Sequence, residues 1–265
     1  MRLTPVALSP RPLTRRTPRS TSMPEKPLVP GIIGGAGPGA TAQLYLDIMI
    51  RSRRVSPHRR PPVLIASLDI DLAMEDRLLR EGVGIEGYWD SLLAAARALI
   101  VAGADFLAIP CNTLHVLLPR LETAVTVPVL SIVDAVAQEV EAAGCRRVGL
   151  LSTASTLHTG LYGDGLRARG IEVVCIGLAL QDSLQARIRD EVGQRTQSEV
   201  PDLADEIGRL FQAEGADAIV AGCTELKAFM ADWVLPMPVI DSLDALGSHI
   251  VRVMTHDHRW QVPRP

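Results

Sequence analysis

Short apolar runs alternate with longer amphipathic stretches along most of the chain. Residues 31–34, 63–66 and 106–109 are apolar, and turn-forming residues bound each of them. Between them lie stretches such as residues 89–102, where apolar positions recur with helical spacing. Strands that alternate with helices are typical of a mostly parallel sheet with helices on its faces. The pattern therefore predicts an α/β protein.

The same pattern occurs twice along the chain. Residues 103–105 and 215–217 both read Gly-Ala-Asp, and each triplet precedes an apolar run. Val-Pro-Val-Leu at 127–130 is matched by Met-Pro-Val-Ile at 237–240, at nearly the same offset. An internal duplication that produced two similar α/β lobes accounts for these matches.

The repeat suggests where the lobes begin and end. We expect residues 31–130 together with 238–256 to form the first lobe, and residues 131–237 to form the second. The start of the chain differs from both, because its first 22 residues carry five Arg and no acidic residue. We expect residues 1–30 to be a disordered tail.

Composition narrows the function classes. The chain has 265 residues, with 27 basic and 30 acidic residues and a net charge of −3. This balance gives no support for a nucleic-acid partner, and no apolar run is long enough to span a membrane. We therefore expect a cytoplasmic protein that acts on a small molecule. Lys26 and Lys227 are its only lysines, which leaves few positions for a pyridoxal phosphate Schiff base.

The four cysteines do not form a recognisable disulfide or zinc pattern, because their spacing is wide and no CxxC occurs. Cys145 and Cys175 are expected to be small buried residues. Cys111 and Cys223 differ, since they lie 112 residues apart at equivalent positions of the repeat. Each follows a predicted strand and precedes a predicted helix, so each is expected at the ligand-binding edge of its sheet.

A thiol at such a position has a chemical use. We expect the first N–H groups of the following helix to favour the thiolate. If the lobes face each other, Cys111 and Cys223 meet across the cleft. One thiolate could then remove a proton from a carbon while the opposite thiol supplies a proton to the other face, which is racemisation by acid–base catalysis.

The residues after each cysteine add polar groups. Asn112 and Thr113 follow Cys111, and Thr224 and Glu225 follow Cys223. These groups could hold a substrate carboxylate, and they could also cap the predicted helices. Glu225 could in addition orient Cys223. The two kinds of role are compatible.

These motifs resemble the cofactor-independent aspartate/glutamate racemase superfamily, and within it the aspartate racemase branch. The resemblance lies in residues 34–38, 110–115, 151–156 and 221–225. It implies two pseudo-symmetric flavodoxin-like lobes, a site between them, and Cys111 and Cys223 as the acid–base pair. It also implies an amino-acid racemase with no cofactor and no metal, assembled as a homodimer.

The resemblance extends the expected substrate-binding residues to Gly35, Arg77, Thr153 and Thr156. Arg77 matches the family's arginine by its distance to Cys111. The family's lysine position falls on Gly193, with Arg195 two residues further on. Aspartate is therefore the first candidate substrate, and glutamate or a broader range of amino acids stays open.

Other functions remain open at this point. One is an isomerase of another dicarboxylic acid such as maleate, and another is a non-catalytic protein that binds an acidic metabolite. His115 could tune the Cys111 thiol, although a packed or solvent-facing histidine is favoured. A metal site made of Cys111, His115 and Cys223 lacks a clear fourth ligand.

Overall fold

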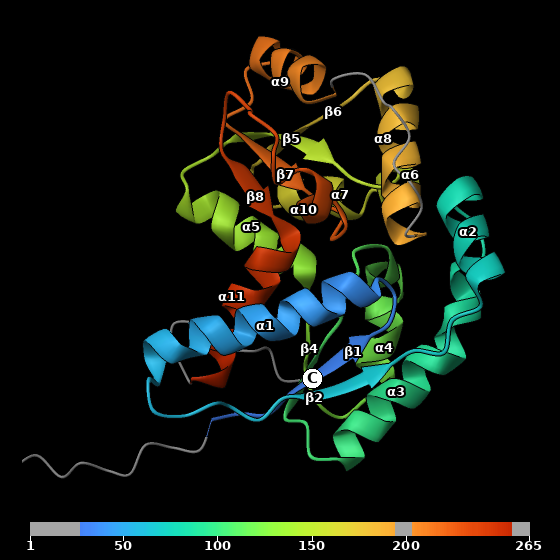
Figure 1. Ribbon diagram of the computed structural model, residues 1–265, viewed down its shortest axis with the longest axis vertical. Helices are drawn as coiled ribbons and strands as arrows, with labels where there is room; N and C mark the ends of the chain where they lie inside the picture. The colour runs from blue at the N-terminus through green and yellow to red at the C-terminus, as the bar shows by residue number, and fades with distance from the viewer. Residues whose placement is uncertain (1–26, 194–202, 256–265) are drawn as a thin grey trace, which may run out of the picture.

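Two parallel four-stranded sheets make up the computed structural model, which describes residues 27–193 and 203–255 (Figure 1). The first sheet has the order β2-β1-β3-β4 and the second has the order β6-β5-β7-β8, which is the same order within each half. The first-sheet strands are β1 (Pro30–Gly34), β2 (Leu64–Ser67), β3 (Phe106–Ala108) and β4 (Val129–Leu130). The second-sheet strands are β5 (Arg147–Leu151), β6 (Glu172–Cys175), β7 (Ala218–Ala221) and β8 (Val239–Asp241). The predicted two-lobed α/β fold is confirmed.

Helices connect the strands within both lobes, and short 3-10 helices are marked η. Those up to the second sheet are α1 (Pro38–Val55), α2 (Leu72–Glu81), η1 (Ile85–Tyr88), α3 (Trp89–Val101), η2 (Thr113–Leu117), α4 (Leu118–Ala124) and α5 (Ile132–Ala142). Those that follow are α6 (Ala154–His158), α7 (Leu161–Arg167), α8 (Leu178–Val192), α9 (Leu203–Ala213), α10 (Leu226–Phe229) and α11 (Ser242–Met254). None of the described helices is long and apolar enough to cross a membrane.

The Gly-Ala-Asp triplets perform the same task in both lobes. Gly103 and Gly215 have φ of +98° and +70°, the left-handed conformation that ends a helix. In each turn the glycine N–H bonds to the carbonyl three residues back, and the next N–H bonds to the carbonyl five residues back. Asp105 and Asp217 then accept hydrogen bonds from backbone N–H groups at the start of the neighbouring strand. The repeat in the sequence is therefore a repeat in structure.

Alternating side chains divide the core into three clusters. In β1, Ile32 packs toward the centre of the molecule and Ile33 toward the outer helices of the first lobe. In β7, Val220 and Ile219 divide in the same way between the centre and the outer helices of the second lobe. The central cluster contains residues of both sheets together with α5 and α11. A continuous apolar core therefore joins the lobes.

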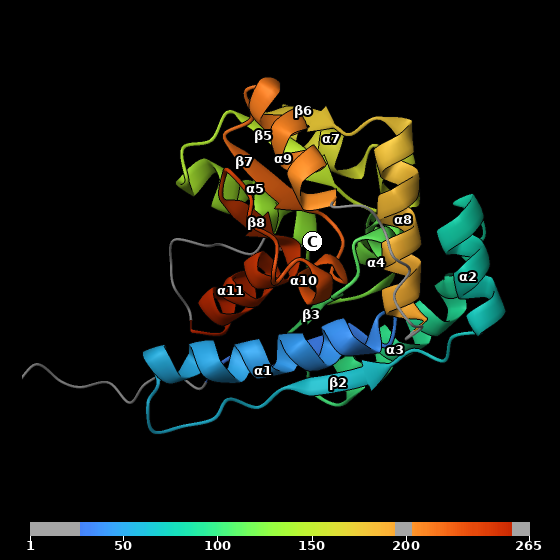
Figure 2. The same ribbon diagram turned by 45° about the horizontal axis from the view of Figure 1, so that its top comes forward.

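The predicted lobe boundary needs one correction. Residues 238–256 were expected in the first lobe, yet β8 pairs with β7 in the second sheet. Only the helix after this strand reaches the first lobe, because α11 packs against α1 and also against α5 (Figures 1 and 2). The chain crosses between the lobes after β8, and not before it.

The predicted tail is also shorter than expected. Leu28 donates its N–H to the Met254 carbonyl at 3.2 Å, and the Val29 N–H bonds to the Asp105 carboxylate at 2.7 Å. Pro30 already belongs to β1. Residues 1–26 of the predicted tail lie outside the described residues.

The two cysteines assigned to the core behave differently. Cys145 is buried in the central cluster, as predicted. Cys175 is exposed, because it lies at the end of β6, the edge strand of its sheet. The prediction that Cys175 is buried was wrong.

The shared core predicts that both lobes unfold together. Leu246 of α11 is fully buried in the central cluster, whereas Leu178 at the start of α8 is 85% exposed. We expect Leu246→Ala to lower the free energy of unfolding by about 2–5 kcal/mol and Leu178→Ala to change it by about 0.5 kcal/mol or less. Denaturant titrations followed by circular dichroism measure both. Two separate transitions in the wild type would contradict the shared core.

Candidate active site

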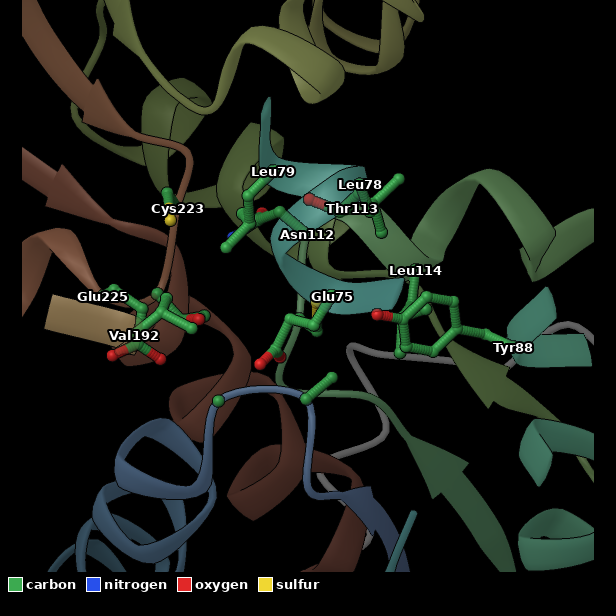
Figure 3. A pocket seen from close by; sticks show the side chains of 14 residues that line it. Glu75, Leu78, Leu79, Tyr88, Asn112, Thr113, Leu114, Val192, Cys223 and Glu225 are labelled. Carbon is green, nitrogen blue, oxygen red and sulfur yellow. The ribbon is translucent and has the colours of Figure 1, made fainter. Parts of the chain in front are cut away.

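A small cavity is lined by residues that follow the carboxyl ends of β3 and β7, the strands that precede Cys111 and Cys223 (Figure 3). Its volume is about 60 Å³, and a single water needs roughly 10–15 Å³ of such space. Both lobes and helix α2 supply its walls: Ala36, Gly37, Glu75, Leu78, Leu79, Tyr88, Cys111, Asn112, Thr113, Leu114, Val192, Cys223, Thr224 and Glu225. The predicted cysteine pair therefore lines one cavity, together with the four polar residues that follow the cysteines.

Each cysteine occupies the same kind of turn. The N–H groups of Thr113 and Leu114 donate hydrogen bonds to the Cys111 thiol. Those of Glu225 and Leu226, again two and three residues on, donate to Cys223. The expected helices are short, because η2 has five residues and α10 has four. Local N–H donors, and not a long helix dipole, therefore act on each sulfur.

Burial of the sulfurs outweighs these donors. Burial, with smaller contributions from the charges of Glu225 and Glu75, raises the pKa of the Cys111 thiol to about 11. Burial also raises the pKa of Cys223, to which the charges of Glu225 and Cys111 contribute. The N–H donors do lower both thiol pKa values, as expected, but burial and nearby carboxylates penalise the anion more strongly, and the net shift is upward.

Glu225 lies against the glycine-rich loop of the opposite lobe. A Cβ atom at Gly37 would collide with its Oε1, and Gly37 has a φ of +86°. Within the described residues this Oε1 is buried without a hydrogen-bond partner. Burial, followed by the charges of Glu191 and Glu75, raises the Glu225 pKa to about 7. The carboxylate therefore titrates near neutral pH.

Both polar atoms of the Asn112 side chain are hydrogen-bonded to residues of α7 and α11. Its Oδ1 accepts a hydrogen bond from the Tyr162 hydroxyl of α7, and its Nδ2 donates to Ser242 Oγ at 3.0 Å. Asn112 lines the cavity, yet only 3% of it is exposed. The structure therefore places its amide as an anchor of the Cys111 turn.

The His115 side chain fixes the same turn through hydrogen bonds to two backbone groups. Its Nδ1 lies 2.8 Å from the Cys111 carbonyl oxygen, and its Nε2 accepts the Ile132 N–H at 2.9 Å. This pattern requires a neutral ring with the proton on Nδ1. Burial lowers the His115 pKa to about 4. His115 is thus a packed residue, as the sequence favoured, and no group of possible metal ligands occurs in the described part of the chain.

Three threonines connect the lobes beside the cavity. Thr113 Oγ1 lies 3.3 Å from Thr156 Oγ1 and 3.5 Å from Thr153 Oγ1. Thr153 caps α6 by accepting the Thr156 N–H. Of these three threonines, Thr113 lines the cavity and Thr153 and Thr156 do not. The latter two therefore contact the wall without forming part of it.

Arg77 does not reach the cavity. Its side chain is 65% exposed and pairs with Glu81 at 3.3 Å. Helical spacing explains the difference, because Glu75, Leu78 and Leu79 share the inner face of α2 while Arg77 lies on the outer face. The predicted role of Arg77 in substrate binding is therefore not supported by its position.

A second, larger cavity of about 560 Å³ shares Glu75, Leu79 and Val192 with the first. Gly35 lies in its wall, and the Gly35 N–H is bonded to Thr41 Oγ1 at 3.1 Å. Gly193, at the position of the family's lysine, also lines this outer cavity. Arg195, the proposed substitute, lies outside the described residues.

The sequence analysis missed the contribution of α2, η1 and α8. Glu75, Leu78 and Leu79 come from α2, Tyr88 from η1 and Val192 from α8. In Figures 1 and 2, α2 and α8 lie side by side at the edge of the molecule. An acidic residue one turn before two leucines, on the apolar face of a helix, was the signal for Glu75.

Lys227 forms ion pairs with carboxylates and does not line either cavity. Its Nζ pairs with Asp47 at 3.2 Å and with Asp244 at 2.7 Å. Arg51 also binds Asp244, at 2.8 Å. These ion pairs connect α10 with α1 and α11 and leave Lys227 outside both cavity walls.

Fold and cavity together define a class of protein, a two-lobed α/β protein with a cavity lined by both lobes. The chain belongs to the Asp/Glu/Hydantoin racemase family, which it matches over residues 33–249. The resemblance seen in its motifs is thereby confirmed.

Individual relatives agree with the family. The broad specificity amino-acid racemase RacX of Bacillus subtilis is 30% identical over 164 residues, which cover 61% of this chain and 70% of the relative. The crystal structure of an aspartate racemase homologue from Pyrococcus horikoshii has a TM-score of 0.68 at 29% identity, covering 86% of this chain and 99% of that one. A glutamate racemase from Francisella tularensis in complex with D-glutamate shares the fold, with a TM-score of 0.61 at 16% identity and coverage of 90% and 84%.

The neutral His115 predicts a loss of stability in acid. Its pKa is about 4 in the folded protein and 6.5 ordinarily, so between these values the unfolded chain binds a proton that the folded chain does not. The free energy of unfolding therefore falls as the pH drops from about 6.5 to 4, by about 3 kcal/mol for this residue. We expect His115→Gln to be less stable at pH 7 and to lose less stability on acidification. Denaturant titrations at both pH values measure this.

His158→Gln is the matched control, because His158 is exposed. It should follow the wild-type pH dependence. An unchanged acid response in His115→Gln would show that the ring is not held neutral.

Proposed function

We propose that this protein is an amino-acid racemase in which Cys111 and Cys223 act as the two acid–base groups. The observation that carries the proposal is the presence of both thiols, from equivalent turns of the two lobes, in the wall of one cavity. A carbon held between them could lose its proton to one sulfur and receive a proton from the other. This is the geometry that inversion requires.

The charges around the thiols suggest how the base is formed. Burial and the nearby carboxylates favour the neutral form of both thiols. The α-ammonium group of an amino acid would bring a positive charge to Glu225. That charge lowers the cost of a thiolate, while the paired N–H donors stabilise it. Substrate binding thus promotes proton removal.

The motifs, the relatives and the position of Arg77 bear on which amino acids are substrates. Aspartate was the first candidate from the motifs, and an aspartate racemase homologue is among the similar structures. RacX is described as a broad specificity racemase. The displaced Arg77 argues against a dedicated aspartate site, so we extend the proposal to amino acids in general. A homodimer remains a prediction.

Removal of either thiol should separate racemisation from proton exchange. We expect Cys111→Ser and Cys223→Ser each to lower racemisation by about 10²–10⁴-fold, since one proton-transfer group is weakened. Each variant should keep α-proton exchange for one enantiomer only, and for opposite enantiomers. Incubation of L- and D-amino acids in deuterated water, followed by mass spectrometry and chiral chromatography, measures both.

Cys175→Ser is the control, because Cys175 is an exposed thiol outside the cavity. It should retain wild-type rates. Full racemase activity in both cavity variants would remove the two-thiol mechanism. Fumarate formation from maleate without amino-acid exchange would replace it with dicarboxylate isomerisation, and ligand-induced thermal stabilisation without turnover would indicate a binding protein.

The raised thiol pKa values predict a rate that increases with pH. A Cys111 pKa of about 11 leaves little thiolate at pH 7, so kcat/KM should rise about tenfold per unit from pH 7 toward pH 9. Glu225→Gln removes a charge that raises both thiol pKa values, and its profile should move to lower pH. A pH-independent wild-type kcat/KM over this range would contradict the assignment of the thiol as base.

A further inference from the structure

The inner cavity carries negative charge that no basic side chain offsets. Among the described residues in its wall, Glu75 and Glu225 are the carboxylates, and neither Arg nor Lys occurs there. Figure 3 shows Glu75 lying between the Glu225 side of the cavity and Tyr88. Glu191 is close enough for its charge to act on Glu225. A second substrate carboxylate would therefore meet like charges at this wall.

The size of the inner cavity directs the substrate side chain outward. With about 60 Å³ around the thiols, the space beyond the α-carbon is limited. The outer cavity of about 560 Å³ adjoins it along Glu75, Leu79 and Val192. A side chain that leaves the thiols by this route passes two apolar residues and the Glu75 carboxylate. An unbranched methylene chain with a polar end suits that path.

The outer wall is also predominantly acidic. Asp69 joins Glu75 there, and Arg189 is the basic residue among its described members. Asp76 also lies in this wall, but it already has an interaction partner and does not enter the balance. Among the described residues of both walls, Glu75, Glu225 and Asp69 outnumber Arg189, and this balance favours a positively charged end group over a negatively charged one.

From this arrangement we infer that the site selects α-amino acids whose side chain ends in a cation over those whose side chain ends in a carboxylate, with Glu75 setting the preference. The inference rests on the proposed racemase function and replaces aspartate as its first substrate. Glu75 comes from α2, so this helix determines specificity while the sheets supply the thiols.

Arg189 defines the competing arrangement. It lies one helical turn before Gly193 on α8, and its Nε is buried without a hydrogen-bond partner among the described residues. A long acidic side chain that reached Arg189 would reverse the preference. The experiment must therefore distinguish Glu75 from Arg189.

The test compares kcat/KM for α-deuteration of L-lysine, L-ornithine, L-methionine, L-aspartate and L-glutamate by the wild-type protein. We expect lysine and ornithine to exceed aspartate and glutamate by about tenfold or more, the effect of one charge-assisted contact. In Glu75→Gln the ratio of lysine to methionine should fall by about tenfold, mainly through KM. Glu206→Gln, an exposed residue of α9 outside both cavities, should keep the wild-type ratio.

Each contrary result has a distinct meaning. A wild-type preference for aspartate or glutamate that Arg189→Gln abolishes would overturn the inference in favour of Arg189, with racemisation intact. An unchanged lysine-to-methionine ratio in Glu75→Gln would also overturn it. Absence of exchange with every amino acid would remove the proposed function itself.

Discussion

The cost of a negative charge in the cavity is the main constraint on the two thiols. Two thiols are enclosed with two carboxylates, and burial favours the neutral form of each sulfur. Against that cost each sulfur has only a pair of backbone N–H donors from its own turn. In the proposed mechanism, a ligand that brings positive charge would offset this cost.

The Cys111 turn is held mainly by groups from elsewhere in the fold. Asn112 is bound by Tyr162 and Ser242, and His115 joins the Cys111 carbonyl to the start of α5. These contacts come from the second lobe and from the central helices. The position of one catalytic candidate thus depends on the packing of the other half of the chain.

Sequence periodicity was sufficient for the sheets, the repeat and the thiol pair, because strand alternation and the Gly-Ala-Asp turns are local features. In α2 the helical spacing distinguishes Glu75 on the cavity face from Arg77 on the outer face, but Arg77 was chosen because of the family resemblance. Periodicity could not have predicted the thiol pKa values, since these depend on burial and on carboxylates far away in sequence. A local sequence pattern cannot reveal a pKa that depends on residues brought together only by the fold.

The crossing of the chain after β8 has a consequence for the two halves. The helix that follows the last strand of each half packs on the opposite half, α11 on α1 and α5 on α7. A single half on its own would leave that helix without its apolar neighbours. Two copies of such a half could cover both helices by exchanging them, so the present chain combines in one molecule what separate halves would have to achieve by association.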